Sequence, residues 1–484
     1  MDSLNNTPKL KRQLGFGAAI GGSVGLVVSG TAMLSVANVG GTAGDATWLS
    51  AILALIPMLA VAAAYGELTA MFPGGGMIGD YTGPALGKFW SMIAVFCGYV
   101  LLIACDGGTQ QVVGALALER AVGIPYLITM AVCLALVLAI NLFGVQFYGK
   151  FEVVFTFILM AVFLLMGVLG FFGAGGIIGN DSISEARGIH LLEPQNGWGS
   201  ALSCVGSAMW WYIGFEFVCP MAEENKSPHK NIPKALLLGL LLVFIADMFF
   251  VYGGLKYLDL DIMATSSTPH IDIAQATMGK AGFIIMTVLT ILACLTTAVA
   301  HMAALPRMLY GLAHKGLVPK AFAYIHPKFR TPWVGIFFTL ALMLMAIIYM
   351  VIYGTDAEIM VMLINIACCT WIISYGIALI NVLYYRIKSP DYPRLWKVPA
   401  GTAVMVIGLI GLAYALFTMK YVWIPALIAM IVFFAYGIIW FRTHNIPLKE
   451  KESIRELVTN IKNRSEELPE WDEAVEKWLA KEGL

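Results

Sequence analysis

The sequence has few charged residues for its length. Lys, Arg, Asp and Glu make up 12% of the 484 residues, whereas a soluble domain normally carries about 25%. Hydrophobic residues make up 59%, and apolar runs recur along the chain, for example at 52–64, 126–142, 153–172 and 235–250. Because about 20 apolar residues span a bilayer, the sequence predicts a polytopic membrane protein without a large soluble domain.

Other features are also missing. No basic stripe occurs outside short loops, so nothing supports nucleic-acid binding. The eight cysteines all lie in apolar segments, and none has a CxxC or Cys/His spacing. We therefore expect free thiols and no metal site. The first residues contain no short hydrophobic region that ends in a cleavage site, so we expect no signal peptide. No hydrolase or transferase motif is present, so we predict neither an enzyme nor a cofactor.

The apolar pattern predicts twelve membrane spans. They lie at roughly 15–41, 47–71, 88–118, 124–143, 150–173, 198–222, 234–256, 280–313, 332–353, 358–385, 400–419 and 422–441. The segment after residue 441 is polar and has helical periodicity on both sides of Pro469, which predicts short surface helices.

Basic residues predict the orientation. With the N-terminus inside, the inner segments before the eleventh span hold sixteen Lys and Arg residues, and the outer loops hold five. The positive-inside rule then places both termini in the cytoplasm of a multi-pass protein of the cell membrane. The even number of spans agrees with this placement.

Two of the spans look interrupted. The sixth contains "MWWYIGFEF", in which Gly214 and the lone carboxylate of Glu216 lie in mid-membrane, and the first contains the glycine-rich "VVSGTAMLSVANVGG". Two broken helices five spans apart are typical of inverted-repeat transporters, in which the unwound turns bind substrate. The alternative is that the glycines only allow close helix packing.

Four collinear segments carry a family resemblance. They are "GTAMLSVANVGG" (30–41), "YGELTAMFPGGGMIGDYTGPALG" (65–87), "WWYIGFEFVCPMAEENKSPHKNIPKA" (210–235) and "LPRMLYGLAHKGLVPKAFAYIHPKFRTPWVG" (305–335). They resemble the corresponding segments of the amino acid–polyamine–organocation transporters. The third and fourth are long and specific, and the resemblance covers about residues 15 to 400.

The resemblance implies an all-α membrane protein with twelve transmembrane helices. Its fold would be the leucine-transporter-type 5+5 inverted repeat with broken first and sixth helices. The implied parts are a cytoplasmic segment 1–14, a first repeat 15–173, an extracellular loop 174–197, a second repeat 198–385, helices eleven and twelve in 386–441, and a cytoplasmic tail 442–484.

The implied function is secondary active transport of an amino acid or small organic amine by alternating access. Exchange of a polyamine or other organic cation is an alternative, as is transport of an uncharged metabolite. A non-transporting receptor or subunit is a different class, against which the full set of broken-helix features argues. An ion channel is disfavoured because no re-entrant filter segment is present.

The resemblance also implies a binding site at the two interruptions. The backbone of Gly30, Thr31, Ala32, Ile213 and Gly214 would hold the polar head of the substrate. Trp210 and Tyr212 would close over it, and Glu216 would couple occlusion to closure of the gate. The alternative for Glu216 is that it only caps the second half-helix.

Three further polar residues lie inside apolar spans: Asp106, His301 and Asp247. An unpaired intramembrane Asp costs roughly 2.5–3.5 kcal/mol or more, so Asp106 should face a substrate amine, an ion or a partner such as Thr109 or Gln110. His301 would line the distal part of the pocket or bond to a backbone carbonyl. For Asp247 we expect a polar partner within the bundle rather than a substrate role.

The sequence departs from the family pattern at two places that bear on the site. Ala32 replaces a glycine that is common in relatives, which narrows the space beside a substrate carboxylate. Leu159 and Met160 occupy the region of a lysine that stands in for a coupling cation in several relatives. The coupling ion, proton or sodium, therefore stays open, and the hydroxyls of Thr296 and Thr297 are only weak evidence for sodium.

Overall fold

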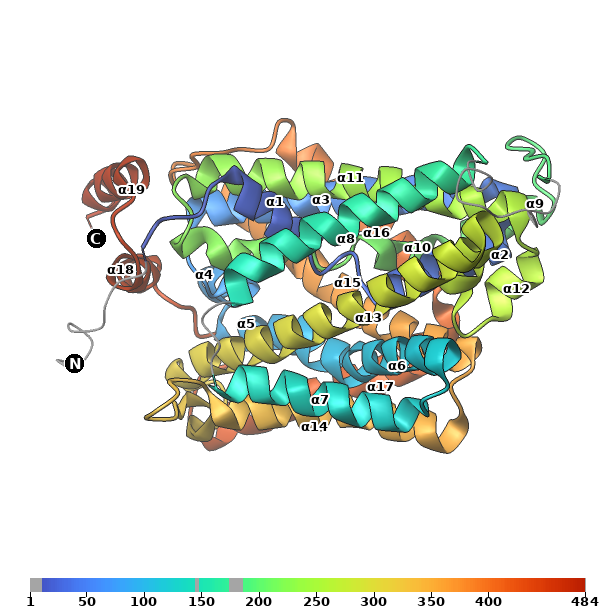
Figure 1. The fold of residues 1–484 in the computed structure, drawn as a ribbon. Coiled ribbons are helices and arrows are strands. Elements are labelled where there is room, and N and C mark those ends of the chain that lie inside the picture. The colour runs from blue at the N-terminus through green and yellow to red at the C-terminus, as the bar shows by residue number, and fades with distance from the viewer. Residues whose placement is uncertain (1–10, 144–147, 174–185, 484) are drawn as a thin grey trace.

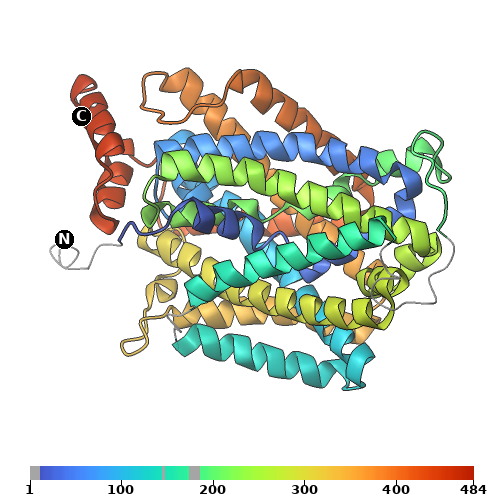
Figure 2. The ribbon, with the colours of Figure 1, turned by 45° about the horizontal axis from the view of Figure 1, so that its top comes forward.

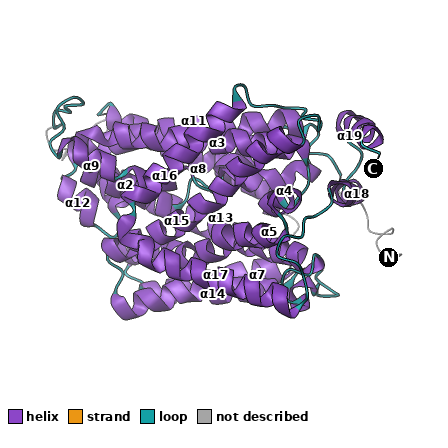
Figure 3. Cartoon of the chain, turned by 180° about the vertical axis from the view of Figure 1, so that it is seen from behind, coloured by secondary structure: helices purple, strands orange, loops and turns teal. Residues whose placement is uncertain are grey.

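The chain is helical along nearly all of its described length. The computed structural model describes residues 11–143, 148–173 and 186–483. Within these ranges the chain has helices and one isolated bridge, between Leu14 and Asn225, but no β-strand (Figure 3). The long helices run side by side as a bundle, and two short helices near the C-terminus lie at one end of it (Figure 1). The prediction of an all-α protein is confirmed for these residues.

The α-helices are α1 (Phe16–Val24), α2 (Gly30–Ala43), α3 (Thr47–Met71), α4 (Met77–Leu86), α5 (Lys88–Val95), α6 (Gly108–Val122), α7 (Tyr126–Phe143), α8 (Tyr148–Phe171), α9 (Gly197–Ser203), α10 (Val205–Met209), α11 (Pro228–Tyr257), α12 (Leu260–Thr265), α13 (Pro269–His314), α14 (Trp333–Tyr353), α15 (Ala357–Lys388), α16 (Gly401–Thr418), α17 (Trp423–Thr443), α18 (Ile454–Arg464) and α19 (Pro469–Lys481). The 3₁₀ segments used below are η5 (Trp210–Tyr212) and η6 (Phe215–Glu223).

The number of spans is ten or eleven by length and composition. Ten helical stretches in the described chain are long and apolar enough to cross a membrane, and a bent helix pair, Gly197–Ser203 with Val205–Glu223, raises this to eleven. Twelve were predicted. The difference arises at the first predicted span, where α1 has only 9 residues and where α2 and α3 count together as one stretch, Gly30–Met71. The prediction of a multi-pass membrane protein is therefore confirmed, whereas the number of twelve spans is not.

The first predicted span is interrupted between α1 and α2. The helix stops at Val24 and resumes at Gly30, and Ser29 caps the second half by accepting a hydrogen bond from the amide of Ala32 at 3.3 Å. Gly30 belongs to α2 itself, and a Cβ added there would clash with the sulfur of Cys294. This glycine therefore serves close helix packing, while the interruption lies just before it.

The sixth predicted span is interrupted at Ile213 and Gly214, as expected. The chain leaves η5 with Ile213 in an extended conformation, and Gly214 has a φ of 106°. L-residues rarely adopt this left-handed region, so a glycine is needed here. The chain then continues as η6, and a bend of 47° separates α9 from the stretch Val205–Glu223.

A further irregularity lies in the third predicted span. Between α5 and α6 the chain forms two π-helical segments, Phe96–Val100 and Ile103–Gly107, and Asp106 lies in the second. A π turn inserts an extra residue into a helix and is frequent at functional sites, because it turns side chains toward a new direction.

The helices differ in how deeply they are buried in the protein. In the apolar window of Lys88–Val122, 89% of the residues are buried, whereas in Lys420–Thr443 only 17% are. α17 is therefore a peripheral helix whose apolar surface needs lipid. All eight cysteines are free, as predicted. Residues 1–10 of the predicted N-terminal segment lie outside the described residues, as do residues 174–185 of the predicted 174–197 loop.

Candidate functional site

A small cavity lies where the two interrupted spans meet the third, eighth and tenth. It encloses about 20 Å³, which suffices for roughly one water molecule. Small-molecule pockets measure about 300–1,000 Å³, so the site is collapsed in this conformation. The lining residues are Leu26, Ser29, Leu102, Asp106, Gln110, Trp210, Ile213, Gly214, Thr297, His301 and Trp371.

Asp106 lies in this cavity and is held by a polar network. The side-chain amide of Gln110 donates to Oδ2 of Asp106 at 3.3 Å and to the hydroxyl of Thr31 at 2.6 Å. The carbonyl of the same side chain accepts a hydrogen bond from the backbone amide of Thr31 at 3.2 Å. Gln110 therefore connects the carboxylate in the third span with the N-terminus of α2. Thr109, the other predicted partner, donates to the carbonyl of Cys105 instead.

Four buried polar atoms of the lining have no hydrogen-bond partner in the described part of the chain. They are Oδ1 of Asp106, Oγ1 of Thr297, Nδ1 of His301 and Nε1 of Trp371. A buried polar atom left unsatisfied costs about 1–3 kcal/mol. Four such atoms around one cavity therefore indicate a site prepared for a polar ligand.

Two tryptophans form an aromatic wall. The rings of Trp210 and Trp371 lie 6.4 Å apart at 72°, and Nε1 of Trp210 donates to the hydroxyl of Thr31 at 3.3 Å. Trp210 therefore bridges the two interrupted spans on one side of the cavity. The ring of Trp371 also lies 5.6 Å from that of Tyr99.

Glu216 lies behind the cavity rather than in its lining. It is fully buried, and its carboxylate accepts hydrogen bonds from the hydroxyls of Tyr375 at 2.7 Å and Tyr99 at 3.3 Å. The amide of Gly214 donates to the hydroxyl of Tyr375 at 3.4 Å. The interruption, Tyr375 and the carboxylate thus form one hydrogen-bonded chain that connects the turn with Glu216.

The structure brings together only part of the predicted set of site residues. Asp106, Trp210, Ile213, Gly214 and His301 line the cavity.

The other predicted residues do not belong to the lining. Gly30, Thr31 and Ala32 form the first turn of α2, beside the lining. Tyr212 points elsewhere, because its hydroxyl donates to the carbonyl of Ala51 at 3.1 Å. Asp247 is buried in α11, and its Oδ2 has no hydrogen-bond partner among the residues described.

Six lining residues did not figure in the predicted set: Leu26, Ser29, Leu102, Gln110, Thr297 and Trp371. Gln110 was considered only as a partner of Asp106. Trp371 lies in "CCTWIISYG" of α15. The signal that could have identified it as a site residue is an aromatic side chain close in sequence to Ser374 and Tyr375. Ser29 precedes the glycine that drew attention in the first span, and its capping role becomes visible only when the helix start is known.

These features define a class of protein: a multi-pass membrane protein with a small polar site between two interrupted helices, the architecture of a secondary transporter. A family model described as amino acid permease matches residues 14–441. The chain belongs to this family, and it is a secondary transporter rather than a member of an enzyme family.

The chain is also similar to individual transporters. It is 22% identical to the branched-chain amino acid permease BcaP of Bacillus subtilis, over 88% of this chain and 91% of the relative. It is 24% identical to the serine/threonine exchanger SteT of the same organism, over 84% and 91%. It is 26% identical to the low-affinity putrescine importer PlaP of Escherichia coli, over 62% and 67%.

Proposed function

We infer that this protein moves an amino acid or small organic amine across the cell membrane by alternating access. The observation that carries this proposal is the cavity between the two interrupted spans, with the carboxylate of Asp106 in its lining. Charged groups inside a membrane mark substrate or ion pathways. The permeases and exchangers among the relatives support the same proposal.

The finer architecture belongs to this proposal. We count twelve spans by taking α1 with α2, and α9 with η6, as one broken span each. The first ten spans would form two inverted repeats, with α16 and α17 outside them. Both termini would be cytoplasmic, which fits the excess of Lys and Arg on the side to which α18 and α19 are attached.

The substrate would be recognised by its ammonium group. Asp106 supplies a carboxylate with one unpartnered oxygen, and the lining contains no Lys or Arg. The hydroxyl of Thr297 and the ring nitrogens of His301 and Trp371 would bond to the rest of the molecule. Because the cavity is far smaller than an amino acid, the side chains around it must move apart before the substrate enters.

A second candidate substrate class is an amine that lacks a carboxylate. In a half-helix start that binds a substrate carboxylate, the first backbone amides should be free. Here the amide of Thr31 donates to Gln110 and the amide of Ala32 donates to Ser29. These contacts support a polyamine or similar organic cation as the second candidate, and one relative is named as a putrescine importer.

A matched pair of ligands separates the two classes. Ornithine and putrescine differ by one carboxylate, and purified protein would be heated with each. A ligand that binds only the folded state at 100 times its Kd raises stability by about 2.7 kcal/mol. Stabilisation by ornithine alone supports an amino acid, and stabilisation by putrescine alone supports the amine class. If neither these two nor a panel of amino acids and amines binds, the proposed function is wrong.

In this proposal the coupling ion is a proton, and Glu216 carries it. Its carboxylate is bonded to two tyrosine hydroxyls, and none of the ion pairs in the described chain involves it. A buried carboxylate of this kind is suited to take up and release a proton as the turn at Gly214 changes. Uptake into proteoliposomes driven by a pH gradient, compared with a sodium gradient, tests this assignment.

A further inference from the structure

The C-terminal helices α18 and α19 are docked on one end of the bundle (Figure 2). We term this end, where the tail contacts Met71, Gly74, Asp80 and Glu223, the tail face. The indole nitrogen of Trp471, which is 1% exposed, donates to the carbonyl of Met71 at the end of α3 at 2.8 Å. Ile461 packs directly on the chain at Gly74, where an added Cβ would lie 2.8 Å from its Cγ1. Apolar burial and hydrogen bonds thus hold the tail in a defined position.

The docked tail completes an ion-pair network that joins four separate parts of the chain. Arg464 of α18 lies 3.4 Å from Asp80 of α4 and 3.2 Å from Glu223 at the end of η6. Lys315, just after α13, lies 2.8 Å from Asp80 and 2.9 Å from Glu452, which precedes α18. The tail therefore contributes one cation and one anion to a network whose other members belong to the bundle.

Two buried charges of this network, Asp80 and Lys315, are stabilised by their partners. Burial alone would raise the pKa of Asp80, but the neighbouring Lys315 and Arg464 outweigh burial and hold the pKa below its ordinary value. Burial alone would lower the pKa of Lys315, and its two carboxylate partners raise it instead. Breaking either tail contact would leave a mostly buried charge without part of its compensation.

The two half-helices α1 and η6 separate the cavity from the tail face, and the ion-pair network lies where they reach that face. α1 runs from the tail face to the interruption at Leu26, and η6 runs back to it from Gly214. The two halves touch, because a Cβ on Gly22 would lie 2.8 Å from the sulfur of Met221. A path from the cavity to the tail face therefore requires η6 and α1 to move relative to α4 and α13.

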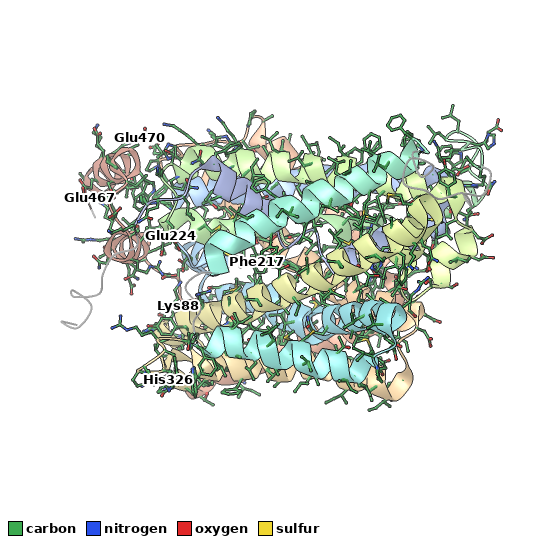
Figure 4. The ribbon with its side chains drawn as sticks, viewed as in Figure 1. Lys88, Phe217, Glu224, His326, Glu467 and Glu470 are labelled. Atoms are coloured by element: carbon green, nitrogen blue, oxygen red, sulfur yellow. The ribbon has the colours of Figure 1, made fainter. Side chains whose placement is uncertain are left out.

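The segment before α1 is attached to the tail as well. The guanidinium of Arg12 donates to the carbonyls of Ala222 and Asn225, at 2.7 and 3.1 Å. It also donates to the hydroxyl of Ser465 and the carbonyl of Glu466, at 3.0 and 2.9 Å. Further along the tail, Glu470 lies near the same end of the bundle as Glu224 (Figure 4).

From these contacts we propose that the C-terminal tail, residues 450–481, is an autoinhibitory latch that restrains opening of the transport path toward the tail face. Arg464 is its key residue, because it bridges Asp80, on the α4 side, and Glu223, on the half-helix that must move. Arg464 is 44% exposed, so salt weakens the latch by screening. The proposal rests on the proposed transport function.

A reversible cross-link tests the latch in the full-length protein. Gly74→Cys with Ile461→Cys places two thiols in contact, while seven of the eight native cysteines are buried and Cys133 is half-buried. The single variants, treated with the same oxidant, are the controls. Oxidation should lock the tail and slow amide hydrogen exchange in Phe215–Glu223 by about tenfold. It should also stop the exchange, in proteoliposomes, of whichever of radiolabelled putrescine and ornithine the parent protein exchanges, until a reductant is added.

The opposite change should release the latch. Arg464→Gln should speed hydrogen exchange in the same segment and raise the rate of ligand exchange at low salt, removing its salt dependence. The matched control is Lys477→Gln, because the one ion pair of Lys477 among the described residues is with Glu473 within α19, at 2.5 Å. This variant should leave both rates unchanged.

Two results would overturn the latch: an oxidised cross-link that leaves hydrogen exchange unchanged, or Arg464→Gln with hydrogen exchange no faster than in Lys477→Gln. The hydrogen-exchange arm needs no ligand. If the parent protein exchanges neither ligand while hydrogen exchange responds as expected, the failure belongs to the proposed substrates and not to the latch.

Discussion

Replacing Gly214 by alanine tests whether the turn in the sixth span controls the site. Gly214 has a φ of 106°, and an L-residue in a left-handed conformation costs roughly 1–2 kcal/mol. The new Cβ would also lie 3.2 Å from Cβ of Leu26, in the interruption of the first span. A crowded methyl group adds about 1 kcal/mol.

The two costs sum to about 2–3 kcal/mol, which lowers the population of this turn conformation roughly 30- to 150-fold. Because the amide of Gly214 also bonds to Tyr375, the change should reach Glu216. We expect Gly214→Ala to lose thermal stability and to slow ligand exchange in proteoliposomes. Gly214→Val, with a branched Cβ, should abolish exchange while the protein still inserts into the membrane.

The matched control is Gly311→Ala in α13. A Cβ there would meet no atom within 4 Å, and alanine favours a helix over glycine by up to about 1 kcal/mol. Thermal unfolding of the purified proteins and exchange in proteoliposomes would be measured side by side. If Gly214→Ala matches Gly311→Ala in both assays, the turn does not control the site and our reasoning is refuted.

Four other predictions concern single residues. Asp106→Asn should weaken binding of a cationic ligand by roughly 1.5–3 kcal/mol, the scale of a hydrogen bond to a charged group; calorimetry that shows unchanged affinity would leave Asp106 only a structural role. Trp210→Ala should speed ligand release in a dissociation experiment, since the ring forms one wall of the cavity, and an unchanged rate argues against a gate. Glu216→Gln should slow exchange but spare equilibrium binding; if binding is lost, the carboxylate is a direct ligand. Because the folded-state pKa of Asp80 lies below its ordinary value, its ion pairs add stability above about pH 4, and this stability is lost as pH falls through the folded value. Acidification below about pH 4 should therefore loosen the tail, and unchanged fluorescence of Trp471 would contradict this.

The interruption of the sixth span could be predicted because its cause is local. Gly214 tolerates a conformation that other residues avoid, and Glu216 is a charge that an apolar helix cannot leave unpaired. Both facts are visible in nine consecutive residues. The structure adds what the carboxylate contacts, Tyr99 and Tyr375, because those residues come from other spans.

The interruption of the first span was harder to locate because its cause is not local. The glycines at 30, 40 and 41 attracted attention, but each is packed closely against another segment: Cys294 at Gly30, Val251 at Gly40 and the chain near Ala264 at Gly41. The turn precedes them. Glycine for packing and glycine for a turn look the same in a sequence, and only the tertiary neighbours distinguish them.

The tail was predicted as short surface helices, and its docking was left open. One of its ion pairs joins Arg464 to Asp80, which is 384 residues away in the chain. The periodicity of a surface helix shows which face is apolar, but it does not show what that face will cover. The membrane-spanning part, in contrast, follows from the lengths of its apolar runs.

The shallow burial of α17 affects how the protein must be handled outside a cell. With 17% of its apolar window covered by the rest of the chain, this helix depends on surrounding acyl chains for most of its contacts. Short-chain detergents form small micelles that cover such a surface poorly, so they should detach α17 before they disturb the deeply buried helices. Long-chain detergents or nanodiscs are therefore the appropriate media for purification.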